Sequence, residues 1–173
     1  MRVSTVSLAI ALAAVSISTS LHGQRPDDQI DARSMALLER GKAARAAGNT
    51  ESATGLIETA LVVDPRNREA YRVLAEIARA QDLPGKAIRL YRESLAIEPN
   101  DPSALRGQGE AMVQKGAVER ARDNLAKIRV ICGSQECGDA TRLASTIAKG
   151  PPITATAAAT TTTPANTIPP AKN

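Results

Sequence analysis

Apolar and polar positions repeat along this chain at an interval of 34 residues. The segments ALVVDPRN at 60–67 and SLAIEPND at 94–101 both pass from apolar side chains through an acid and a proline to polar residues. Their prolines, Pro65 and Pro99, lie 34 positions apart. Because proline lacks the amide donor that a helix interior needs, each is expected just beyond the end of a helix. A fixed period of this kind is typical of architectures built from repeated helical units.

Counting each proline as position thirty-two gives three units, at 34–67, 68–101 and 102–135. Other positions then agree between the units: the fourth holds Leu37, Tyr71 and Leu105, the eighth Gly41, Ala75 and Gly109, and the twentieth Ala53, Ala87 and Ala121. Large apolar residues let two helices share a core, and small ones let their backbones approach closely. Turn-forming residues interrupt the middle of each unit, at Gly48, Pro84 and Gly116. We therefore predict helices at about 28–47, 50–63, 68–81, 84–97, 102–115, 118–131 and 137–149.

These residues resemble the tetratricopeptide repeat family, whose unit of about 34 residues carries small residues at positions eight, twenty and twenty-seven and proline at thirty-two. The resemblance covers residues 34–135. It implies an all-α fold, a short right-handed solenoid of three helical hairpins in a domain at 28–149, closed by a C-terminal capping helix at 137–149. Four residues depart from the family pattern: Arg40 and Gln108 at the seventh position, Ile128 at the twenty-seventh and Gly133 at the thirty-second.

In the tetratricopeptide family the first helix of each unit lines a concave groove, through positions two, five, nine, twelve and thirteen. Carried over to this chain, the resemblance gives a partner-binding groove with eight charged residues: Lys42, Arg45, Glu69, Arg72, Glu76, Arg79, Arg106 and Glu110. The uncharged groove positions hold Met35, Leu38, Ala46, Ala80, Ser103, Val113 and Gln114. The arginines could bind carboxylates of a peptide through their forked donors. Alternatively, they are ordinary solvated charges paired with glutamates at helical spacing.

The family also contains domains that hold chaperone C-termini with a clamp of lysine, asparagine and arginine side chains. In this chain the corresponding positions hold Leu38, Lys42, Val73, Ser103 and Gly107. The clamp is therefore not expected, and the resemblance leaves the chemistry of the partner open.

Composition argues against several functional classes. Aromatic residues make up only 1% of the chain and phenylalanine and tryptophan are absent, so the core must be aliphatic. The one histidine, His22, lies in the N-terminal segment 1–23, which has the layout of a signal peptide. The rest of the chain has no histidine for general-base catalysis or for a zinc site. Without Arg2 and Lys172, which lie near the two ends, the positive and negative charges of the chain are close to balance. Stacking aromatics are also missing, so nucleic acid is not an expected partner. We predict no catalytic residues, no metal and no cofactor.

The two ends differ from the middle. Residues 1–23 carry one early cation, Arg2, then an apolar stretch and small polar residues, which is the layout of a signal peptide. The expected location is therefore periplasmic or secreted, without membrane insertion of the mature domain. An uncleaved anchor is the alternative, because the stretch from Val3 to Gln24 contains no charged residue. Residues 150–173 are rich in Thr, Ala and Pro, and we predict that they form a disordered tail.

Cys132 and Cys137 are the only cysteines in the chain. In an exported protein, a pair at this spacing favours a disulfide. Because the pair spans the end of one predicted helix and the start of the last, the bond would tie the terminal helix to the stack.

Together these features predict a noncatalytic protein-interaction module or scaffold of the cell envelope, which binds a peptide or helix of a protein partner in its groove. This step rests on analogy with the fold. Two alternatives stay open: a homo-oligomeric structural protein that self-associates through its surface or array ends, and an accessory subunit of an envelope enzyme complex.

Overall fold

The computed structural model describes residues 29–133 and 137–152, and all regular secondary structure in these residues is helical. The predicted all-α fold with seven helices is confirmed. The helices are α2 (Ala32–Ala46), α3 (Thr50–Val63), α4 (Arg68–Ala80), α5 (Pro84–Ile97), α6 (Pro102–Gln114), α7 (Val118–Cys132) and α8 (Gly138–Lys149). The predicted signal peptide at 1–23 and most of the predicted tail at 150–173 lie outside the described residues.

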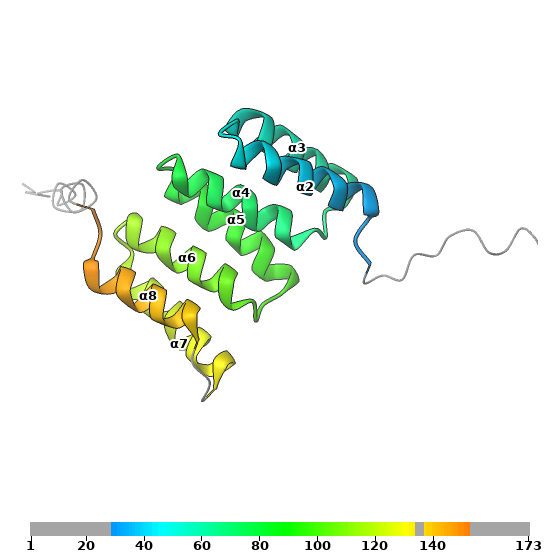
Figure 1. Cartoon of the computed structure of the whole chain (residues 1–173). Coiled ribbons are helices and arrows are strands. Elements are labelled where there is room, and N and C mark those ends of the chain that lie inside the picture. The colour runs from blue at the N-terminus through cyan, green and yellow to red at the C-terminus, as the bar shows by residue number, and fades with distance from the viewer. Residues whose placement is uncertain (1–28, 134–136, 153–173) are drawn as a thin grey trace, which may run out of the picture.

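The helices form three antiparallel hairpins that stack side by side into a helical solenoid (Figure 1). The pairs α2 and α3, α4 and α5, and α6 and α7 make the hairpins, and α8 packs against both helices of the last one. Each hairpin also contacts the next, through α3 with α4 and α5 with α6. Because a single hairpin cannot bury both of its apolar faces, stacking completes the core.

Polar side chains set the starts of four helices. Asp31, Asn49, Asn67 and Asp101 each accept a hydrogen bond from a backbone amide in the first turn of α2, α3, α4 and α6. Such caps satisfy amides that have no partner within the helix. The prediction that the first helix begins at 28 was wrong: residues 29–31 are not helical, and α2 begins at Ala32, directly after its cap.

The turn inside each hairpin has a residue with left-handed backbone at the same repeat position. Gly48 and Gly116 adopt φ values of 81° and 86°, and Asp82 adopts 58°. Glycine has no steric penalty in this conformation, whereas an aspartate does. The Asp82 carboxylate accepts a 2.7 Å hydrogen bond from Gln114 Nε2 of the next hairpin, so this residue also links neighbouring repeats.

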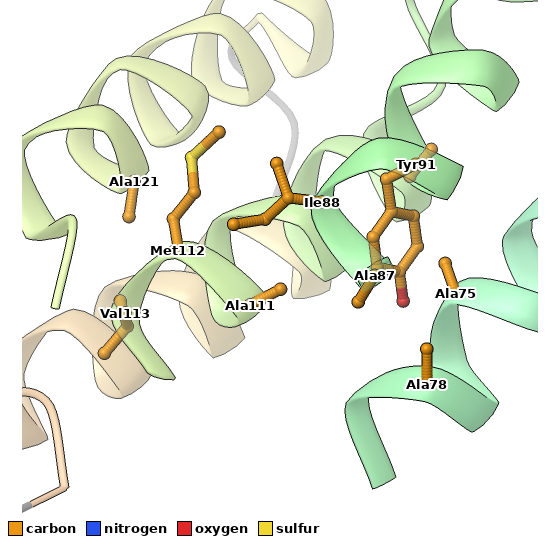
Figure 2. Packing of buried hydrophobic residues seen from close by; sticks show 10 residues of the cluster. Ala75, Ala78, Ala87, Ile88, Tyr91, Ala111, Met112, Val113 and Ala121 are labelled. Atoms are coloured by element: carbon orange, nitrogen blue, oxygen red, sulfur yellow. The ribbon is translucent and has the colours of Figure 1, made fainter. Parts of the chain in front are cut away.

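The core depends on close approach between helices, as Figure 2 shows around Tyr91. The Tyr91 ring is only 1% exposed and packs near Ala75, Ala78 and Ala87. A Cβ atom at Gly107 would lie 2.3 Å from the Cζ and hydroxyl oxygen of this ring, so α6 can approach α5 only because residue 107 has no side chain. Gly107 therefore serves the packing of α6 against α5.

Departures from the repeat pattern have local compensation. Gln108, at a position where the family favours leucine, is buried and accepts a 3.0 Å hydrogen bond from the buried Asn124 side chain. Asn124 Nδ2 also donates to the Leu105 carbonyl at 3.0 Å, so the polar pair is held inside the third hairpin. Ile128, in place of a small residue, is fully buried and packs with Leu143 of α8.

The predicted disulfide between Cys132 and Cys137 is present. It joins the last residue of α7 to the residue before α8, with the two Cα atoms 6.0 Å apart. Both cysteines pack against the apolar cluster that includes Leu125, Ile128 and Leu143. The bond therefore holds the capping helix at the end of the stack.

Candidate functional site

The candidate site is the surface formed by α2, α4, α6 and α8, which we call the first-helix face. The first helix of each hairpin contributes to it, and α8 continues it beside α6. All eight charged residues expected in the groove lie on α2, α4 and α6, with side chains between 11% and 37% exposed. The site is thus a partly buried charged surface.

Ion pairs connect consecutive hairpins across this face. Lys42 of α2 donates to Glu69 of α4, and Arg45 Nη1 of α2 donates to Glu76 Oε2 of α4 at 2.6 Å. Further along, Arg79 Nη2 of α4 lies 3.1 Å from Glu110 Oε2 of α6. These contacts join side chains about one repeat apart in sequence, so the first-helix face is crosslinked along the stack.

Other pairs lie within a single helix at the spacing that places side chains on one helical face. Arg72 Nη1 donates to Glu76 Oε1, and Arg106 Nη1 donates to Glu110 Oε1, each at 3.0 Å. Arg106 Nε also donates to Asp139 Oδ1 of α8 at 2.6 Å. The expectation of pairs at helical spacing therefore describes part of the network, and the remaining pairs bridge different helices.

The electrostatics of Glu69 follow from this network. The hydrogen bond from Lys42 is the main cause that lowers the pKa of Glu69, against a smaller opposing effect of burial. Nearby Arg72 and Arg68 lower this pKa further. The pair between Lys42 and Glu69 therefore stays ionised at a lower pH than an isolated glutamate would allow.

Because Arg45, Arg72, Arg79 and Arg106 are each paired with a carboxylate, the structure does not present an open row of guanidinium groups. A guanidinium has five N–H donors, so pairing leaves donors available to a ligand. A peptide carboxylate on this face would therefore have to share or displace an internal glutamate.

A hollow of about 490 Å³ opens on the first-helix face, at the C-terminal ends of α2, α4, α6 and α8. Its lining comes from all four first-face helices and from the segment after α8: Arg45, Glu76, Arg79, Ala80, Glu110, Val113, Gln114, Thr146, Gly150 and Pro152. Two buried polar atoms in this lining, Arg79 Nε and Gln114 Oε1, have no hydrogen-bond partner among the described residues. The hollow thus combines apolar surface with a donor and an acceptor that a local shift of side chains could make available.

One groove assignment was wrong. Leu38, expected at a groove position, is fully buried and packs in the cluster with Ile57, Val73 and Ile77. Its repeat counterparts Arg72 and Arg106 do lie on the first-helix face. The chemistry of the side chain decides the difference, because a leucine gains by turning into the core while an arginine keeps its charge near water.

The sequence did not reveal the contribution of α8. Asp139 and Thr146 of α8, together with Pro152, complete the charged network and the hollow. No repeat position of the pattern marks these residues. Their role follows from the packing of α8 beside α6, which the period alone does not specify.

Two further properties bear on what the site can do. Within residues 29–133 and 137–152, no three His, Cys, Asp or Glu side chains gather closely enough to hold a metal ion. Each helix in the same residues is too short or too polar to cross a bilayer.

Comparison with known proteins agrees with this architecture. A model of the tetratricopeptide repeat family matches residues 38–102. Among curated protein sequences, no match was found. The O-GlcNAc transferase of Thermobaculum terrenum is similar in structure, with a TM-score of 0.54 and 26% identity, but the match covers 58% of this chain and only 19% of the transferase.

Two solved domains match over nearly their whole length. The first tetratricopeptide domain of Spaghetti, solved with an HSP90 peptide, has a TM-score of 0.63 and 16% identity, covering 70% of this chain and 96% of that domain. The Yersinia enterocolitica type III secretion chaperone SycD, solved with a peptide of the translocator YopD, has a TM-score of 0.62 and 18% identity, with coverages of 70% and 95%. The stacked helices of this chain therefore have the tetratricopeptide repeat fold, and its residues 38–102 also match the sequence model of that repeat family.

Proposed function

We propose that this chain is a noncatalytic protein-interaction module that binds a peptide or short helix of a protein partner on its first-helix face. The observation that carries the proposal is the hollow of about 490 Å³ bordered by α2, α4, α6 and α8. Its volume lies within the range of pockets that bury most of a small ligand's surface. A few side chains of a peptide would fill it.

The charged network supports the same role. Acidic and basic side chains alternate across the face, and their pairing holds α2, α4, α6 and α8 in a fixed arrangement. Ordering these side chains before a ligand arrives reduces the entropy lost on binding. The solved domains of Spaghetti and SycD, which share the fold, were each determined with a bound peptide.

We also propose that the module works after export, as a scaffold in the cell envelope. Residues 1–23 have the layout of a signal peptide, and the disulfide between Cys132 and Cys137 suits an oxidising compartment. Fusion of the N-terminal segment to alkaline phosphatase tests export, because this enzyme is active only outside the cytoplasm. An inactive fusion would contradict export, and a retained leader in the mature protein would favour the anchored form.

The binding proposal is tested with an unbiased peptide library displayed on phage and selected on the immobilised chain. A bulky substitution at the exposed Ala80, which lines the hollow, fills the site without removing an ion pair. Ala80→Phe should weaken binding of the selected peptides by more than about tenfold, because the phenyl ring occupies the volume that the ligand needs.

The matched control is Ala96→Phe, the same substitution at an exposed alanine on the helix α5, outside the lining of the hollow. This variant should bind like the wild type. An equal loss of peptide binding in both variants, or unchanged peptide binding in Ala80→Phe, would contradict the assignment of the binding site to this hollow.

Self-association is a second candidate, favoured by apolar side chains on one edge of the stack. Val63, Ile97 and Ile131 occupy the same position in the three repeats and are 37%, 41% and 37% exposed. Regularly spaced apolar residues at the surface are a feature of interfaces. Sedimentation at increasing concentration tests self-association. A constant monomer mass would count against it. A mass that rises with concentration in the wild type but not in Ile97→Asp would support it.

A further inference from the structure

A second hollow lies between α5 and α7, which are the second helices of the second and third hairpins. These two helices do not belong to the first-helix face. We call this second hollow the α5/α7 hollow. Its volume is about 420 Å³ and its lining is Arg92, Leu95, Pro99, Leu105, Gln108, Met112, Arg120, Asp123, Asn124 and Lys127. The charged members are three cations, Arg92, Arg120 and Lys127, and one acid, Asp123.

The cations of this hollow differ from those of the first-helix face. On that face every groove cation is paired with a carboxylate. In contrast, Arg92, Arg120 and Lys127 make no ion pair or side-chain hydrogen bond with any residue in the described part of the chain, and all three are exposed. Asp123 is also exposed and offsets one of the three charges. The rim of the hollow therefore has an excess of positive charge that no residue within 29–133 and 137–152 neutralises.

The floor of the hollow is apolar and well packed. Leu105 and Met112 of α6 are 3% and 4% exposed, and the half-buried Leu95 of α5 packs against the same core. Figure 2 shows the Met112 side chain lying between Ile88 of α5 and Ala121 of α7. Leu105 and Met112 are therefore covered, and the half-buried Leu95 is the aliphatic side chain that a ligand between the two helices can reach, with the cations at the edge.

The buried amides beside this floor add a polar element. Asn124 Nδ2 donates to Gln108 Oε1 and to the Leu105 carbonyl, both at 3.0 Å, so the two amide side chains are fixed in orientation. Such an internal network keeps α6 and α7 at a set distance, and the hollow keeps its shape without a ligand.

From this arrangement we infer that the α5/α7 hollow is a docking site for an acidic, leucine-containing peptide segment of a protein partner. An aliphatic side chain of the segment lies on Leu95, above the buried Leu105 and Met112. Flanking carboxylates pair with Arg92, Arg120 and Lys127. The charge complementarity selects acidic partners, and contact with Leu95 adds apolar burial to these exposed ion pairs. Nucleic acid fits the site less well, because no aromatic side chain in the lining could stack on a base.

The test uses the purified chain and a fluorescein-labelled peptide of alternating glutamate and leucine, with binding measured by fluorescence anisotropy. The double variant Arg92→Glu with Lys127→Glu reverses one cation on each side of the hollow. It should weaken binding by at least about tenfold, since two attractive contacts become repulsive. Asp123→Asn should strengthen binding by about two- to fivefold, because it removes the acid that repels the ligand.

A charge-matched control reverses Lys86 on α5 and Arg129 on α7, which are exposed and lie outside the lining. Lys86→Glu with Arg129→Glu changes the net charge by the same amount and should leave binding within about twofold of wild type. An equal loss in the control and the test variant would overturn the proposal, because general electrostatic attraction would then explain the binding.

Two comparison ligands test the chemistry of the occupant. A peptide of alternating glutamate and serine should bind at least about fivefold more weakly, since it has no aliphatic side chain for the floor. Equal affinity for both peptides would overturn the role of the floor. A single-stranded oligonucleotide that binds more tightly than the glutamate and leucine peptide, and loses this binding in Arg92→Glu with Lys127→Glu, would overturn the assignment to a protein partner.

Discussion

The contact between Gly107 and Tyr91 allows a direct test of how the hairpins pack. Replacing Gly107 by alanine would place a Cβ atom 2.3 Å from the Cζ and hydroxyl oxygen of the Tyr91 ring. Carbon atoms in contact normally lie about 3.5 to 4.0 Å apart, so the ring or the helix α6 must move by more than about 1 Å. The ring is only 1% exposed and is surrounded by the core, so it has little room to move.

The magnitude follows from two opposing effects. Overpacking a core costs about 1 to 3 kcal/mol, and replacing a helical glycine by alanine gains about 1 kcal/mol in helix propensity. With so short a contact we expect Gly107→Ala to lower the free energy of unfolding by about 1 to 2 kcal/mol. The matched control is Gly55→Ala in α3, where a new Cβ would meet no atom within 4 Å. This variant should gain about 0.5 to 1 kcal/mol.

Urea unfolding followed by circular dichroism measures both changes. With a slope of about 1 to 3 kcal/mol per molar urea, the midpoints of the two variants should differ by about 1 M. The double variant Gly107→Ala with Tyr91→Leu should lose at least about 1 kcal/mol less stability than the sum of the losses in the two single variants, because the leucine no longer clashes with the new Cβ atom. If Gly107→Ala stabilised the protein as much as Gly55→Ala, the close approach of α6 to Tyr91 would be refuted.

Three further predictions concern stability. The hydrogen bond from the Arg66 side chain, with that from the Asp31 amide, lowers the pKa of Asp64 to about 2. Asp64→Ala should therefore lower the free energy of unfolding by about 1.5 to 3 kcal/mol above pH 4. The stability difference between the variant and the wild type should shrink as the pH falls toward 2, which urea unfolding at a series of acidic pH values measures. Replacing Cys132 and Cys137 by serine should cost about 2 kcal/mol, and a reductant should lower the melting temperature of the wild type but not of this variant. Asn124→Ala should cost about 1 to 3 kcal/mol in urea unfolding, because the amide of Gln108 loses its buried partner, whereas changing both residues to leucine should cost less.

The helices were predictable from the sequence because their ends are set by local chemistry. Pro84 and Pro102 start α5 and α6, and Pro65 and Pro99 follow the ends of α3 and α5, so the period of the prolines indicates where helices begin and end. The recurring small residues also indicated which positions lie between helices. Gly41 and Gly109 at the eighth position show this most clearly, since a Cβ atom there would lie 2.4 Å from Ile57 and 2.7 Å from Leu143. The close approach at Gly107 has no such signal, because its repeat counterparts are Glu39 and Val73.

The pairing within the candidate site was not predictable to the same extent. Spacing along one helix indicates that Arg72 can reach Glu76, but only the angle between stacked hairpins decides that Arg45 reaches the same glutamate from α2. The sequence also gives no sign that Asp139 of α8 would pair with Arg106. These contacts depend on packing between units, which the repeat period does not encode.

Which face binds the partner peptide can be measured directly on the chain with Arg92→Glu and Lys127→Glu, in which the α5/α7 hollow is disabled. A peptide selected from the library on this variant is mapped on it with amide chemical shifts. We expect the largest shifts at the residues that line the hollow of the first-helix face, with Ala80 of α4 and Gln114 of α6 among them. Shifts confined to α3, α5 and α7 would contradict the claim that the first-helix face is the binding surface.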